Sequence, residues 1–111
     1  MKIYLTGKPV IQKTDRNEKR YAAELALYRS SSPVTGSLQA DVTFFMPYPK
    51  DPQKKLAGVF HEKYPPVHKM LDFLFESLDE NGICKSGQIG KCIVKKVYSF
   101  ASGTQIKLEK L

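Results

Sequence analysis

The stretch PPVHKMLDFLFESLDENG, residues 65–82, carries the clearest fold signal in the chain. Its apolar residues recur at steps of three and one, and they are Val67, Met70, Leu71, Leu74, Phe75 and Leu78. This spacing predicts a helix with a single apolar stripe. Two prolines precede the pattern and Asn-Gly follows it, as is typical of a helix start and of a left-handed helix end. We therefore expect a helix that begins after Pro65-Pro66, stops at Asn81-Gly82 and packs on a core.

Alternating segments on both sides of this helix predict strands. Residues 2–6 and 38–46 alternate between polar and apolar side chains, and so do residues 89–100 and 104–110. The last two segments flank a turn at residues 101–103, which predicts a hairpin. Asp15 with Glu18 three residues later is typical of a helix start, so we expect a further helix through about Arg29.

These elements fit one domain that spans residues 1–111. We predict an α+β fold in which two helices pack on a mixed, mostly antiparallel four-stranded sheet. The N-terminal residues contain no apolar run of the kind that a signal peptide has, and no segment is apolar enough to cross a membrane. We therefore expect a cytoplasmic protein without a membrane partner.

The charge of the chain is its most informative bulk property. Lys and Arg number 18 against 11 Asp and Glu, which gives a formal net charge of +7. A polyanionic partner such as nucleic acid is one explanation, and solubility alone is another. The proline-containing loop between residues 46 and 67 carries several of these lysines. Cys84 and Cys92 lack the spacing of a zinc site, so we interpret them as reduced thiols.

Several motifs along the chain resemble the RusA family of Holliday-junction resolvases. The family begins with a strand that ends in Gly-x-Pro, seen here at residues 7–9, and a later strand ends in Phe-x-Pro, seen at residues 45–47. Its helix carries Asp-Ala-Leu near the end, which Glu76-Ser77-Leu78 resembles, and Asp-Asp-x-Gln-Ile follows, which residues 85–89 resemble. The resemblance implies a RusA-like fold, a homodimer, and DNA with a branch or four-way junction as the partner.

The departures from the family pattern fall on its catalytic carboxylates. The matching positions hold Pro66, His68 and Ser86, and a basic position of the family's helix holds Asp72. The family's enzymes use clustered carboxylates to hold Mg²⁺, which activates water for phosphodiester hydrolysis. Proline offers no ligand, and serine and histidine are poor ligands for this hard cation. We therefore predict no catalytic residues, no bound metal and no cofactor.

The sequence thus predicts a RusA-like protein of phage or prophage origin that binds branched DNA without cutting it. The basic residues expected to contact nucleic acid are Lys13, Arg16, Lys54, Lys55, Lys63, Lys69 and Lys85.

Two alternatives stay open. One is an active Mg²⁺-dependent endonuclease whose metal ligands have moved to the stripe His68, Asp72, Glu76 and Asp79, which is otherwise the solvated face of a helix. The other is a RusA-derived module that binds an unknown host or phage protein.

Overall fold

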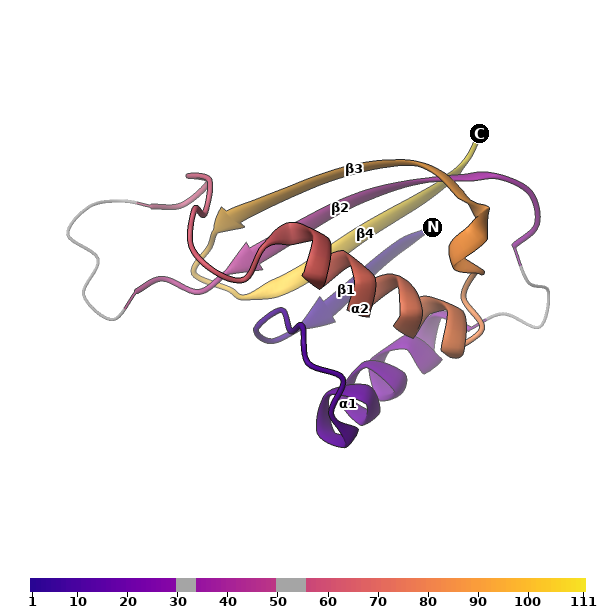
Figure 1. The fold of residues 1–111 in the computed structure, drawn as a ribbon, viewed down its shortest axis with the longest axis horizontal. Coiled ribbons are helices and arrows are strands. Elements are labelled where there is room, and N and C mark those ends of the chain that lie inside the picture. The colour runs from indigo at the N-terminus through magenta and orange to yellow at the C-terminus, as the bar shows by residue number, and fades with distance from the viewer. Residues whose placement is uncertain (30–33, 50–55) are drawn as a thin grey trace.

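The computed structural model describes residues 1–29, 34–49 and 56–111 (Figure 1). The predicted binding residues Lys54 and Lys55 lie outside these ranges. The elements in chain order are β1 (Lys2–Thr6), α1 (Asp15–Leu25), the 3₁₀ helix η1 (Ala26–Tyr28), β2 (Leu38–Met46), α2 (Val67–Glu80), the 3₁₀ helix η2 (Ser86–Gln88), β3 (Ile89–Tyr98) and β4 (Gly103–Lys110).

The four strands form one mixed sheet in the order β1-β4-β2-β3. Strand β4 is antiparallel to both β1 and β2, whereas β3 is parallel to β2. The prediction of a single α+β domain with a mixed four-stranded sheet and two helices is confirmed.

The predicted hairpin of β3 and β4 is wrong, because β2 lies between these two strands. Strand β2 has the most buried residues of the four strands, and most of its side chains are buried on one face or partly covered on the other. Because β2 pairs with a strand along both of its edges, this apolar strand lies inside the sheet. The lysine-rich β3 lies at the edge of the sheet.

Both helices pack on the same face of the sheet (Figure 1). The core between the layers contains Ile3, Leu5, Tyr21, Leu25, Val42, Phe44, Met70, Leu74, Leu78 and Ile106, all with 2% exposure or less. Each buried aliphatic side chain contributes about 1.5–3 kcal/mol by its removal from water. The two helices also meet directly, since the rings of Tyr21 and Phe73 pack edge to face at 5.2 Å. In the described part of the chain, no helix covers the opposite face of the sheet, where Lys91, Lys95 and Lys107 are exposed.

The helix boundaries follow local signals. Helix α2 begins after Pro66, and Asn81 and Gly82 follow its last residue. The φ of Gly82 is +73°, the left-handed conformation that glycine adopts readily. Helix α1 begins at Asp15, and the Thr14 side chain caps it by accepting from the Asn17 N–H. The α-helix stops at Leu25, and one 3₁₀ turn replaces the last turn that the sequence predicted. Among the described residues, neither helix has the length and apolar content required to cross a bilayer.

The two edges of the sheet are protected differently. On β1, the N–H of Tyr4 donates to the Tyr28 hydroxyl and the N–H of Thr6 donates to the Glu24 carboxylate. On β3, residues 57–61 cover only the far end, where the N–H of His61 donates to the carbonyl of Lys96. No backbone hydrogen bond from the described residues reaches the same edge between residues 90 and 94. The first half of β3 is therefore the open edge of the sheet.

Candidate nucleic-acid interface

Two adjoining hollows lie at the end of the molecule where α2 begins. The first hollow has a volume of about 210 Å³, and its lining consists of Lys8, Met46, Pro47, Pro49, His61, Lys63, Tyr64 and Tyr98. The second hollow has a volume of about 310 Å³, and its lining consists of Lys8, Pro9, Val10, Ile11, Gln12, Asn17, Tyr64 and Pro65. Lys8 and Tyr64 belong to both hollows. Among the described residues, neither lining includes a carboxylate.

Three lysines surround an exposed aromatic ring at this place. The Tyr64 side chain is 69% exposed, and the Lys69 Nζ lies 5.8 Å from the centroid of its ring. Among the described residues, Lys8, Lys63 and Lys69 form no ion pair. We call Lys8, His61, Lys63, Tyr64 and Lys69 the α2-start surface. The N-terminal end of the helix dipole adds to its positive potential, so the surface combines the features that bind phosphates and stack on bases.

A buried lysine supports this surface from below. Lys96 is 8% exposed, and its Nζ donates to the carbonyl of Lys63 at 2.5 Å and to the carbonyl of Pro65 at 2.7 Å. Burial lowers the pKa of its ammonium group. These two hydrogen bonds fix the chain immediately before α2 and therefore set the position of Lys63 and Tyr64.

His61 links the loop to the sheet. Its ring lies 4.8 Å from the ring of Tyr98, with an interplanar angle of 53°. Burial lowers the pKa of His61 below its ordinary value of 6.5, and the nearby positive charges of Lys96 and Lys63 lower it further. The imidazole is therefore neutral at pH 7, so its contribution to the surface is a ring and a hydrogen-bonding edge and not a charge.

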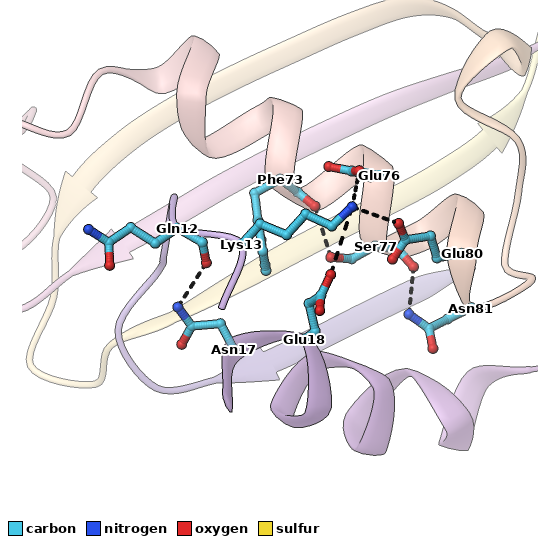
Figure 2. Close-up of polar contacts among 9 residues, drawn as sticks. All are labelled: Gln12, Lys13, Asn17, Glu18, Phe73, Glu76, Ser77, Glu80 and Asn81. Carbon is cyan, nitrogen blue, oxygen red and sulfur yellow. Dashed lines mark hydrogen bonds and ion pairs between the residues drawn. The ribbon is translucent and has the colours of Figure 1, made fainter. Parts of the chain in front are cut away.

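The other end of α2 is acidic. A third hollow, of about 340 Å³, has a lining of Asp72, Phe75, Glu76, Asp79, Glu80 and Ser86. Figure 2 shows Lys13 reaching from the loop before α1 toward α2, where its Nζ lies 2.6 Å from Glu76 and 3.2 Å from Glu80. Hydrogen bonds to these two carboxylates raise the pKa of Lys13. The charge of Lys13 is matched by carboxylates, and the acidic hollow that Glu76 and Glu80 help to line repels phosphate.

The three positions that match the family's carboxylates do not converge within one chain. Pro66 and His68 lie at the start of α2, whereas the backbone N–H and hydroxyl of Ser86 contact Asp79 at 3.1 and 3.3 Å. Asp79 follows His68 by eleven positions, which is about 16 Å along a helix axis. Across residues 1–29, 34–49 and 56–111, no group of three His, Cys, Asp or Glu side chains is placed to hold a metal ion.

The remaining predicted binding residues are divided between the two ends. Lys63 and Lys69 belong to the α2-start surface. Arg16 is exposed in the first turn of α1, and Lys85 is exposed beyond the far end of α2, where its N–H donates to the Gln88 side chain.

The sequence did not predict three site residues that lie at the end of the molecule where α2 begins: Lys8, Tyr98 and Lys96. A signal existed for Lys96, because the alternation of β3 places this lysine at an inward position. The sequence predicts His61 to be a surface residue without a catalytic role, and the structure places its ring against Tyr98.

Comparisons with protein-family models and with curated proteins give no match for this chain.

Proposed function

We propose that the protein is a RusA-like DNA-binding protein that recognises branched or four-way DNA through the α2-start surface and does not cut it. The observation that supports this best is the placement of Lys8, Lys63 and Lys69 near the exposed ring of Tyr64, beside two hollows whose described lining residues include no carboxylate. Lysines neutralise phosphates, and an exposed tyrosine gives an unpaired base a surface for stacking.

Side-chain chemistry supports the second part of the proposal, that the protein does not cut DNA. Phosphodiester hydrolysis by a magnesium nuclease needs several carboxylate oxygens close together. Pro66, His68 and Ser86 supply none. Of the carboxylates that line the acidic hollow, Asp72 lies in the first half of α2, whereas Glu76, Asp79 and Glu80 lie in its second half. Two of these carboxylates, Glu76 and Glu80, are already paired with Lys13.

A homodimer would suit the proposed DNA. A four-way junction has two-fold symmetry, so two copies of the chain related by a two-fold axis would present two equivalent α2-start surfaces to it.

The interaction-module alternative has one observation in its favour. On the face of the sheet that the described helices leave open, Phe60 is 67% exposed and lines a hollow of about 300 Å³, and Ile93 is 46% exposed. Exposed apolar side chains of this kind can bind a protein partner.

The direct test is binding of a fluorescent four-way junction, a matched duplex and a single strand, measured by anisotropy near 50 mM salt. We expect binding to all three, with the junction bound most tightly. The same samples are incubated with Mg²⁺ or Mn²⁺ and examined for nicks, and we expect none. Failure to bind any DNA would favour the interaction module. Symmetric nicking that is lost in Asp72→Asn or Glu76→Gln would establish the displaced-ligand enzyme instead.

A further inference from the structure

The first hollow has the size and lining of a site for one flat group. Its volume of about 210 Å³ is below the roughly 300–1,000 Å³ of pockets for drug-sized ligands. Met46, Pro47, Pro49 and the ring of Tyr98 provide apolar walls, whereas Lys8 and Lys63 provide the cations. A bare phosphate would leave most of these apolar walls uncovered. A planar ring that carries a phosphate would use both parts of the lining.

The ring of Tyr98 is held in place before any ligand arrives. Its backbone N–H donates to the carbonyl of Val59 at 3.0 Å, and its carbonyl accepts from the N–H of Gly58 at 3.1 Å. The rings of His61 and Tyr48 pack against it at 4.8 and 6.3 Å. A wall fixed in this way loses little conformational entropy when a ligand stacks on it.

Polar groups without partners gather around the same ring. Among the described residues, the Nδ1 of His61 and the hydroxyl of Tyr48 are enclosed and have no hydrogen-bond partner. Buried polar atoms normally have partners, and unpaired ones call for an explanation. Of these two residues, His61 lines the first hollow, so a ligand with donors and acceptors on its edge would meet the imidazole there.

We propose that the first hollow binds one unpaired nucleobase of a DNA strand, stacked along Tyr98, with its polar edge toward His61 and its phosphates on Lys8 and Lys63. This inference rests on the proposed DNA-binding function and names the part of the DNA that is recognised. A base inside a duplex is stacked and paired, so it reaches a concave site only when it is extruded or already single-stranded. The centre of a junction, a bulge or a single strand provides such a base.

The test compares a duplex that contains a one-base bulge with the fully paired duplex of the same sequence. The bulged base is 2-aminopurine, whose fluorescence reports stacking, and affinities are measured by anisotropy. Wild-type protein should bind the bulged duplex more tightly and change the 2-aminopurine signal. Tyr98→Leu should reduce this preference about 10-fold, in line with the energy of stacking one base on an aromatic ring. Tyr98→Phe should retain the preference.

Phe60→Leu is the matched control, because Phe60 is an exposed ring on the segment that pairs with the end of β3 but lies in a different hollow. Thermal unfolding followed by circular dichroism checks the fold of each variant. If Tyr98→Leu is unfolded, His61→Gln and the 2-aminopurine signal of the wild type decide the question, with loss of preference expected in the former.

The outcomes separate the two proposals. If the wild type binds no DNA, the proposed function fails. If it binds bulged and paired duplexes equally, or if Tyr98→Leu weakens both equally, only the nucleobase site is wrong. Deoxyadenosine monophosphate is added as a competitor, and we expect it to leave the bulged duplex bound. Displacement by this mononucleotide would overturn the assignment to a DNA strand and indicate a site for free nucleotides.

Discussion

Replacing Lys8, Lys63 and Lys69 together by glutamine removes the three described cations of the α2-start surface. Glutamine keeps much of each side chain's length and polarity and removes only its charge. None of the three lysines forms an ion pair with a described residue, so the change leaves no carboxylate without a partner. We therefore expect the fold to be unchanged and the affinity for DNA to depend less steeply on salt.

The size of this effect follows from counterion release. Each phosphate neutralised by a lysine contributes about 0.9 to the slope of log affinity against log salt, so three lost contacts flatten the slope by about 2.7. Between about 50 and 200 mM salt, the wild type should consequently lose ~40-fold more affinity than the variant. Fluorescence anisotropy on one duplex across this salt range measures both slopes.

The matched control is Lys91→Gln with Lys107→Gln and Lys110→Gln. Both triple variants change the formal net charge from +7 to +4, since each loses three lysines. In the sheet, the control lysines lie opposite residues 38–41, at the start of β2. Tyr98 of the first hollow lies opposite Met46, at the other end of β2, so the control lysines lie away from that hollow. Equal flattening in both variants would refute the α2-start surface as the DNA contact and indicate binding through overall charge alone.

Three further outcomes are expected. Lys96→Met leaves the carbonyls of Lys63 and Pro65 without their donor, so it should lower the free energy of unfolding by about 1–3 kcal/mol in urea denaturation; a gain in stability would mean that desolvation of the ammonium outweighs its hydrogen bonds. The pKa of His61 is lower in the folded protein than in the unfolded chain, so the unfolded chain binds a proton at this histidine at a higher pH. The free energy of unfolding should therefore fall as the pH falls below about 6.5. The stability of His61→Gln should depend less on pH over that range. If the variant and the wild type had the same pH profile, His61 would not be the group responsible. Light scattering should give a mass near twice the chain mass of 12.6 kDa, and a monomer at every concentration would contradict the homodimer.

The sequence predicted the elements well because their signals are local. The apolar stripe of α2 and the alternation of β2 depend on spacing within a few residues, and both elements lie where these patterns placed them. Strand pairing is not local. The alternation of residues 89–100 and 104–110 indicates two strands but does not identify their neighbours, and sequential strands are adjacent only about two-thirds of the time.

The site was predicted less completely, because it depends on which distant residues meet. Lys63 and Lys69 were named because they flank the positions that match the family's active site, and the structure places both near Tyr64. Lys13 is similarly basic in sequence, yet the fold brings it to Glu76 and Glu80, more than sixty residues away. Lys8 and Tyr98 join the first hollow only because the end of β1 and the end of β3 lie beside the loop before α2.

The unequal edges of the sheet limit how many chains can share it. Side chains from α1 and η1 occupy the backbone donors of β1, so a further strand cannot add there without displacing them. The open half of β3 can accept one strand. If that strand is β3 of a second copy, the open edge of each copy is paired with the other. Growth by strand addition would then end at two chains with a single continuous sheet. As far as the described residues show, a sheet with one usable edge forms a closed pair, and strand addition does not extend it into a fibre.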